Sequence, residues 1–427
     1  INSSYGISAT NFVTPTYGAP LATVVDSAMH ISAIQGGRHV SLLNGRTVSG
    51  VSGIVTALRS DGFNLQEPVI MEDSDPATSE GIFVRTGSAP TVLVGQSVLV
   101  NGKVEEFRPD TNNLTITRLI NPTVTVQSSG NPLPAAIIIG SGGRQPPTQI
   151  IEDDASNVET DGVFDPDNDG IDFYEALEGM LVQVNDAVAV GATTAFGEIA
   201  VLVDGGAGAS LRTPRGGIVI QANDFNPERV ILDDVITPNP PDVLVGDSFP
   251  GAIVGVLDYG FGNFKLLNTA PLPSPVSGGL TPESTTITRT DDQITLATFN
   301  VENLDPTDPP AKFAALANQI VTNLAAPDIL AVEEVQDSDG PANTSVVEAS
   351  VTWGLLISAI QTAGGPTYDF RNVDPVDDQD GGEPGGNIRV GFLFRADRGI
   401  AFVDRPGATS TTANGAVMGG SGVQLNY

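Results

Sequence analysis

The strongest constraint on the fold comes from two short apolar runs late in the chain, at 295–304 and 327–337. Each has the length and composition of a strand buried on both faces, and each ends in polar residues. The segment between them, 312–324, carries apolar residues at helical spacing. The sequence therefore predicts a strand, a helix and a second strand in succession.

The polar residues at the two strand ends are Asn300 in the first run and Glu333 and Glu334 in the second. An amide and a carboxylate side by side offer the oxygen ligands that Mg²⁺ and Ca²⁺ prefer. These residues are therefore candidates for a divalent metal site. The alternative interpretation is an acidic loop after a buried strand, without a metal ion.

The segments ATFNVENL at 297–304 and PDILAVEEVQD at 327–337 closely resemble the opening of the nuclease domain in the endonuclease/exonuclease/phosphatase superfamily, in its branch of large secreted bacterial nucleases. The resemblance implies a metal-dependent nuclease in which Asn300 and Glu334 belong to the metal site, with Asn300 also taking part in catalysis. Glu333 stands where the family usually has Gln.

A third segment, GGNIRVGFLF at 385–394, resembles the next core strand of that family. The resemblance implies that Asn387 and Arg389 are catalytic residues that orient the scissile phosphate. The family completes its site with two histidines, one of which activates water, and with further Asp and Asn ligands from its second half. The only histidines here are His30 and His39, both far upstream. The nuclease domain is therefore expected to be about half present, and these 427 residues to be inactive by themselves.

The net charge of −32 limits the ways in which this chain can bind nucleic acid. With 19 Lys and Arg against 51 Asp and Glu, binding through phosphate neutralisation is not expected. A bound metal ion can invert the potential locally, so the charge does not exclude nuclease chemistry. The favoured interpretation of the charge is solubility in a secreted, calcium-containing or saline setting.

The predicted localisation is secreted and extracellular. The chain has no cysteine, which excludes disulfides and thiol chemistry. No apolar run approaches the roughly 20 residues of a membrane helix, so no membrane span is expected. The chain begins at Ile1 rather than Met, which is compatible with a removed signal peptide.

The 48 Gly and 31 Pro predict a turn-rich, mainly β chain. Between residues 28 and 130, five short strands alternate with turns, which favours a small closed barrel. This block resembles the OB-like domain that precedes the catalytic domain in secreted nucleases of this branch. Because few Lys or Arg accompany Phe63, Phe83 and Phe107, a scaffold is favoured over a nucleic-acid platform. The strands are expected at 48–58, 62–65, 81–86, 98–107 and 113–119.

The motif VLVG occurs at 92–95 and again at 243–246, each time before a strand, and predicts a degenerate duplication of the barrel. The predicted fold class is mainly β with an α/β C-terminal part: two tandem OB-like β-barrel domains, then the first half of a four-layer α/β sandwich nuclease domain. The predicted domains are an N-terminal arm at 1–27, an OB-like β-barrel at 28–130, a linker at 131–147, a second β-barrel-like domain at 148–285 and a partial endonuclease/exonuclease/phosphatase domain at 291–427.

The second β block opens with an acidic turn, DPDNDG at 165–170. Asp165, Asp167 and Asp169 alternate as in calcium loops, where carboxylates gather on one side of a tight turn, so a structural Ca²⁺ is predicted there. The twelfth position is Ala176 rather than Glu, so the loop is not an EF-hand. The alternative is an acidic turn without a metal ion. Further carboxylates close by in sequence are Asp153, Asp154, Asp172 and Glu175.

The sequence favours an extracellular metal-dependent nuclease that hydrolyses phosphodiester bonds of DNA or RNA. It would use Mg²⁺ or Ca²⁺ at the half-site, with nucleic acid as the substrate of the completed site. The alternative is an extracellular structural, filament or assembly subunit derived from a nuclease. This alternative rests on the missing half-site and on the strand-prone arm at 1–27. Copies of the chain would then pair as a homo-oligomer through that arm or through exposed sheet edges.

Overall fold

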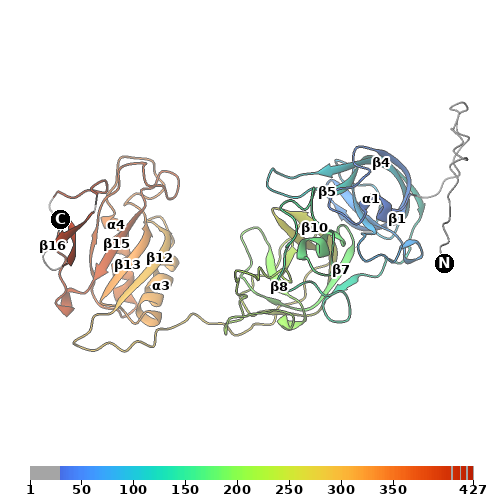
Figure 1. Ribbon diagram of the computed structural model, residues 1–427. Coiled ribbons are helices and arrows are strands. Elements are labelled where there is room, and N and C mark those ends of the chain that lie inside the picture. Colours follow the sequence, from blue (N-terminus) through green and yellow to red (C-terminus); the bar gives the residue numbers. More distant parts are fainter. Residues whose placement is uncertain (1–28, 405–406, 414, 420–421, 427) are drawn as a thin grey trace, which may run out of the picture. The chain divides into compact units, whose positions relative to one another are not determined.

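The computed structural model describes residues 29–404, 407–413, 415–419 and 422–426. The chain divides into two compact units, an N-terminal unit up to Leu280 and a C-terminal unit from Thr281 (Figure 1). The predicted N-terminal arm at 1–27 lies outside the described residues. No described helix has the length and apolar character needed to cross a membrane.

The first β block of the N-terminal unit is a closed barrel with the strand order β1-β2-β3-β5-β4. Strands β3 and β5 are parallel, and the other neighbouring pairs are antiparallel. Side chains alternate between the interior and the surface along β4, as a two-residue period requires. The elements are α1 (Ile31–Gln35), β1 (Thr47–Arg59), β2 (Gly62–Gln66), η1 (Val69–Met71), β3 (Gly81–Arg85), β4 (Ser97–Phe107) and β5 (Ile116–Ser128).

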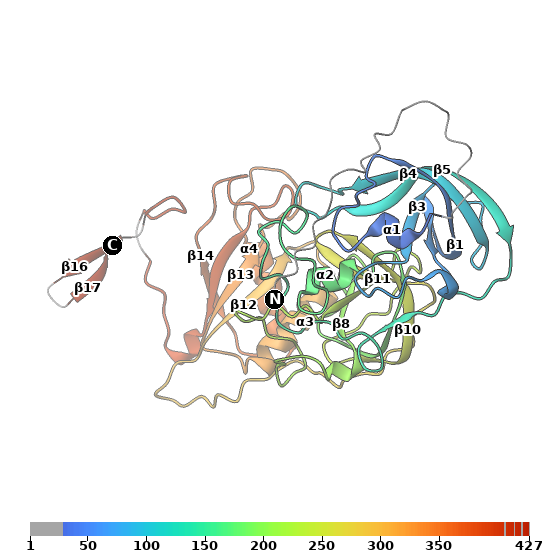
Figure 2. The same ribbon diagram turned by 45° about the vertical axis from the view of Figure 1, so that its right-hand side comes forward.

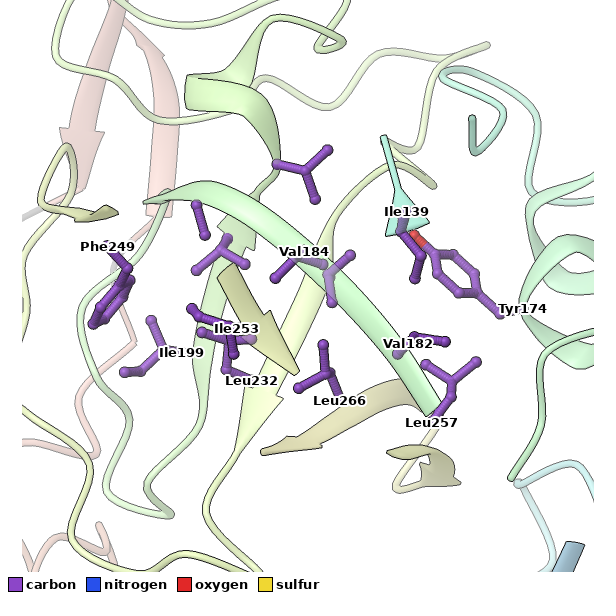
Figure 3. Close-up of a cluster of buried hydrophobic side chains, with 14 of the residues drawn as sticks. Ile139, Tyr174, Val182, Val184, Ile199, Leu232, Phe249, Ile253, Leu257 and Leu266 are labelled. Carbon is purple, nitrogen blue, oxygen red and sulfur yellow. The ribbon is translucent and has the colours of Figure 1, made fainter. Parts of the chain in front are cut away.

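The second β block is a six-stranded sheet in the order β10-β11-β9-β8-β7-β6, and β10 also pairs with β7. Figure 3 shows its core, where Ile139, Val184 and Leu266 pack with Tyr174 from α2. The elements are β6 (Ile137–Ile139), α2 (Gly170–Glu175), β7 (Leu181–Ala189), β8 (Ile199–Leu202), η2 (Asp204–Gly206), β9 (Val230–Asp233), β10 (Ser248–Gly260) and β11 (Asn263–Asn268).

The pairing order β7-β8-β9-β11-β10 of the second block repeats the order β1-β2-β3-β5-β4 of the first. In each block one neighbouring pair of this order is parallel, β3 with β5 in the first block and β9 with β11 in the second. The two VLVG motifs lie at equivalent places, directly before β4 and β10. Their glycines, Gly95 and Gly246, have φ values of 79° and 87°, a left-handed conformation that glycine adopts without strain.

The two β blocks meet through close backbone contact. A Cβ atom added at Gly81 would lie 2.3 Å from the carbonyl carbon of Gly179, so only glycine fits there. Nearby, the N–H of Leu181 donates to the side-chain oxygen of Gln66 at 2.8 Å. These contacts join the blocks into one unit, with α2 and the first barrel close together in both ribbon views (Figure 2).

The segment predicted as a linker, 131–147, does not behave as one. Its residues Ile137 to Ile139 form β6, which pairs in parallel with β7. Ile139 is fully buried in the core of the second block. Three consecutive isoleucines make this piece of a Pro-rich segment a strand, because burying them beside β7 removes apolar surface from water.

The C-terminal unit contains a four-stranded sheet in the order β12-β13-β15-β14, with β12 and β13 parallel. The predicted strand, helix and strand at 295–337 are confirmed as β12, α3 with η3, and β13. The elements are β12 (Leu296–Leu304), α3 (Pro310–Asn318), the π-helical turn η3 (Gln319–Asn323), β13 (Ile329–Val335), α4 (Ser350–Thr362), β14 (Asp369–Asn372), β15 (Arg389–Phe394), η4 (Ala396–Arg398), β16 (Gly415–Gly419) and β17 (Gly422–Asn426).

The predicted fold class is wrong as stated. The protein is mainly β with few helices, and the described part of the C-terminal unit has one four-stranded sheet and a hairpin of β16 and β17, not a four-layer α/β sandwich. Helices α3 and α4 bury one face of that sheet, whereas Leu296, Val390 and Phe392 stay exposed. In the N-terminal unit, β6 completes a six-stranded sheet, and the blocks pack together instead of forming two tandem barrel domains.

A pair of glycine substitutions tests the packing of α4 on this sheet. A Cβ at Gly391 in β15 would lie 2.4 Å from the ring of Trp353, which is fully buried. Gly391→Ala should therefore lower the free energy of unfolding by about 2 kcal/mol. Gly354→Ala on the exposed side of α4 meets no atom within 4 Å and should raise it by about 0.5–1 kcal/mol. Urea unfolding followed by fluorescence of Trp353, the single tryptophan, measures both; equal effects would contradict this packing.

The environment of Asp328, directly before β13, predicts that the stability of the C-terminal unit depends on pH. Burial raises the pKa of this carboxyl, but hydrogen bonds from the N–H and Oγ1 of Thr295 and the charges of Arg289 and Arg398 bring it below its usual value. A lowered folded-state pKa contributes stability above the unfolded-state pKa, and this contribution is lost as the pH falls through the folded-state value.

Asp328→Asn should therefore lower the free energy of unfolding by roughly 2–3 kcal/mol at pH 7, less than for a fully buried pair because both arginines are partly exposed. The difference between wild type and variant should shrink below about pH 4. Urea unfolding at several pH values, followed by tryptophan fluorescence, measures it. A difference that is constant with pH would rule out ionised Asp328 as the stabilising form.

Candidate active site

Strands β12 and β13 bring two of the predicted site residues together where their pairing register breaks. The strands are parallel neighbours, with Asn300 opposite Glu333 in register. The side-chain amide of Asn300 donates to Oε1 of Glu334 at 2.6 Å. The hydroxyl of Thr298 donates to Oε1 of Glu333 at 2.6 Å. An amide and two carboxylates therefore stand side by side at the end of the sheet.

The backbone around this group is strained. Glu302, Asn303 and Glu334 have φ values of 58°, 49° and 61°, in the left-handed region that non-glycine residues rarely adopt. The register of β12 against β13 shifts at this point, as in a bulge that re-aims a side chain. The amide oxygen of Asn300 accepts from the N–H of Glu302 at 2.8 Å and holds the turn. Strained backbone of this kind gathers at functional sites.

An acidic hollow adjoins the two glutamates. Its charged lining residues are Glu333, Glu334, Asp380 and Arg389, three carboxylates and one guanidinium. Its other lining residues are Val373, Pro375, Ile388, Val390 and Ser410. The excess of negative charge favours a cation in the hollow and opposes a free phosphate.

Arg389 reaches this hollow but is held by protein atoms. It is 6% exposed, and its Nη1 donates to the carbonyl of Val347 at 2.5 Å and to Oδ1 of Asp374 at 2.9 Å. Its Nη2 donates to the carbonyl of Asn387 at 2.8 Å. Burial lowers the pKa of the guanidinium, while Asp374 acts in the opposite direction. The positive charge at the hollow is therefore fixed in place.

Asn387 holds the loops behind the hollow together. It is 2% exposed, and its Nδ2 donates to Oδ2 of Asp337 and to the carbonyl of Val346, each at 3.0 Å. Its Oδ1 accepts from the N–H of Asp378 at 3.0 Å. Since both ends of the amide bind protein atoms, Asn387 positions the strand of Arg389 and does not face the hollow.

A second acidic group lies in the loop of the second β block. The structure gathers Asp165, Asp169 and Asp172 there, and also Glu152, Asp154 and Asp169, with ligand atoms within 4.8 Å of one another in each triad. Asp167, predicted as a ligand from its spacing, is exposed and belongs to neither triad. Glu152 was missed, because it precedes the acidic turn by thirteen residues and no spacing pattern connects them.

Asp169 is the most perturbed carboxyl of this loop. Burial, followed by the close approach of the Asp165 carboxyl, raises its pKa to about 7. Ionisation near neutral pH therefore meets the repulsion of neighbouring carboxylates.

His39 joins the two β blocks. It is buried, with Nε2 2.6 Å from Oδ1 of Asp172 and Nδ1 3.4 Å from Oε2 of Glu175. Burial lowers its pKa, but the two carboxylates outweigh it and raise the pKa to about 9. A protonated imidazole has no lone pair for a metal ion, so His39 acts as a buried cation. His30 contacts Glu67 at 3.3 Å within the first block.

Comparison with known proteins covers one part of the chain. Residues 138–277 match a family model described as a domain of unknown function (DUF8508). This match covers the second β block, including the acidic loop. No curated protein sequence matches the chain.

The left-handed backbone at Glu334 predicts a gain in stability when the carboxylate is removed. Glu334→Gly should raise the free energy of unfolding by about 0.5–1 kcal/mol, because glycine adopts this φ without strain. Glu333→Gly is the matched control, since it also loses one hydrogen bond but lies in ordinary strand backbone, and should lower it by a similar amount. Urea unfolding followed by tryptophan fluorescence compares the two. Destabilisation of equal size by both would show that Glu334 is not strained.

Proposed function

We propose that the C-terminal unit takes part in metal-dependent hydrolysis of phosphodiester bonds, with nucleic acid as substrate, outside the cell. The observation that carries the proposal is the pair of Asn300 and Glu334, joined at 2.6 Å where the pairing register of two parallel strands breaks. The resemblance of these segments to secreted nucleases also supports Asn300 and Glu334 as part of a metal site.

The residues present fit a hard divalent cation. Mg²⁺ is commonly bound by one or two carboxylates together with substrate phosphate and water. Glu334 keeps a second carboxylate oxygen beside the one that accepts from Asn300. The hydrogen bond from Asn300 orients the carboxylate, as a supporting residue does for a metal ligand. When bound, the cation supplies the positive charge that a phosphodiester needs in this acidic hollow.

The other residues of the site bind and orient. Arg389 adds a fixed positive charge at the hollow, where a phosphate oxygen carries negative charge. Asn387 keeps the backbone of Arg389 in place through the hydrogen bonds of its side-chain amide. Neither histidine belongs to the C-terminal unit. In this proposal the residues of this unit therefore hold and orient the phosphate.

Substitutions in the native protein test this proposal. Glu334→Gln removes the charge with little change in shape and should lower kcat/KM on labelled DNA or RNA by roughly 100-fold in Mg²⁺ or Ca²⁺. Asn300→Ala should lower it by about 10-fold to 100-fold through loss of orientation. Asp369→Asn, which removes an exposed carboxylate from β14 of the same sheet, should leave it unchanged.

The thermal midpoint of each variant separates loss of chemistry from loss of folding. Full activity of Glu334→Gln in a folded protein would contradict the proposal. Weaker Mn²⁺ binding by Glu334→Gln, seen by electron paramagnetic resonance, would agree with the assigned ligand.

A further inference from the structure

Asp169 in the acidic loop is a buried carboxylate that lacks a protein partner. It is 1% exposed, and neither of its oxygens has a hydrogen-bond partner among the described residues. Asp169 also occupies the N-cap position of α2, yet its side chain makes no cap hydrogen bond. Aspartate at this position commonly bonds the backbone of the next turn. The side chain is instead directed towards other carboxylates.

Those neighbours form two triads that share Asp169. Its ligand atoms lie within 4.8 Å of those of Asp165 and Asp172, and likewise of those of Glu152 and Asp154. Oδ1 of Asp165 is also buried without a hydrogen-bond partner among the described residues. Burying several carboxylates together costs a great deal of free energy unless a positive charge neutralises them.

Among the described residues, no Lys, Arg or His side chain pairs with Asp169. His39 bonds Asp172, an outer member of the group, and not Asp169. Oδ2 of Asp172 accepts from the N–H of Asp165 at 2.8 Å, which folds the loop back upon itself. The loop thus brings its carboxylates together and leaves the central one unpaired.

We propose that this loop, within 152–172, binds one divalent cation of the calcium type through Asp169 and Asp165, with Glu152, Asp154 and Asp172 completing the oxygen shell. Ca²⁺ takes six to eight oxygen ligands in a flexible geometry, which five carboxylates on an irregular loop can satisfy. Mg²⁺ demands a tighter octahedral site, and Zn²⁺ prefers nitrogen and sulfur ligands. The ion acts as a structural clamp.

The clamp connects the two β blocks. Asp172 lies in the proposed oxygen shell, and its Oδ1 contacts His39 of the first block at 2.6 Å. Occupancy orders the loop that carries Asp172 and so supports this contact. The site is independent of the C-terminal unit, and its failure would leave the proposed hydrolytic site untouched.

The experiment uses the full chain with Glu334→Gln, so that the C-terminal site does not contribute to metal binding. After treatment with a chelator, calorimetric titration with CaCl₂ or MgCl₂ should show one Ca²⁺ site with Ca²⁺ preferred. At 100 times the dissociation constant, Ca²⁺ should raise the midpoint of the N-terminal unit by about 5 °C or more. The tryptophan transition of the C-terminal unit should not move.

Two asparagine variants decide which carboxylates bind. Asp169→Asn should weaken Ca²⁺ by at least about tenfold and abolish the thermal shift, while its metal-free midpoint equals or exceeds that of the parent. Asp167→Asn is the matched control on the same loop and should bind Ca²⁺ as the parent does. Absence of Ca²⁺ binding at millimolar concentration, or equal losses in both variants, would overturn the proposal.

Discussion

Carboxylates held out of water are the constraint on which this structure depends. The chain carries 51 Asp and Glu against 19 Lys and Arg, so most acidic side chains cannot find a basic partner. Water hydrates the carboxylates on the surface, but a buried carboxylate must be paired, hydrogen-bonded or protonated. Asp328 is paired with arginines and Asp172 with His39. Glu334, which is only half-buried, accepts from the amide of Asn300. Asp169 has none of these partners among the described residues.

In the N-terminal unit, this constraint acts where the two β blocks meet. The blocks share one pairing order, and their backbones touch at Gly81 and Gly179, where a side chain would not fit. The acidic loop and α2 lie beside this junction, and His39 from the first block reaches the carboxylates of the second. The proposed metal site in the loop and the contact between the blocks therefore share one aspartate, Asp172.

In the C-terminal unit, the left-handed backbone at Glu334 coincides with the negative charge of Glu333 and Glu334. Parallel strands bring their carboxyl ends to one edge of the sheet, and the irregular register of β12 and β13 turns Glu334 towards Asn300. The left-handed backbone there costs free energy that a glycine would save. Retaining a glutamate in such a conformation is what a site selected for chemistry, and not for stability, would show.

Local patterns in the sequence were sufficient for the first strands and the helix of the C-terminal unit. The apolar runs at 295–304 and 327–337 predicted β12 and β13, and helical spacing predicted the segment between them, because periodicity reflects which face of an element is buried. The same reasoning placed Asn300 beside Glu334, since neighbouring parallel strands end at one edge.

Tertiary structure alone decided the rest. The sequence predicted the three isoleucines of β6 as part of a Pro-rich linker, but in the structure they pair with β7. A four-layer sandwich was expected from resemblance, but the described sheet has helices on one face and exposed side chains on the other. Spacing selected Asp167 as a candidate ligand, whereas the folded loop gathers Glu152, Asp154, Asp165 and Asp172 around Asp169. Periodicity specifies elements, but which carboxylates converge depends on contacts between residues far apart in sequence.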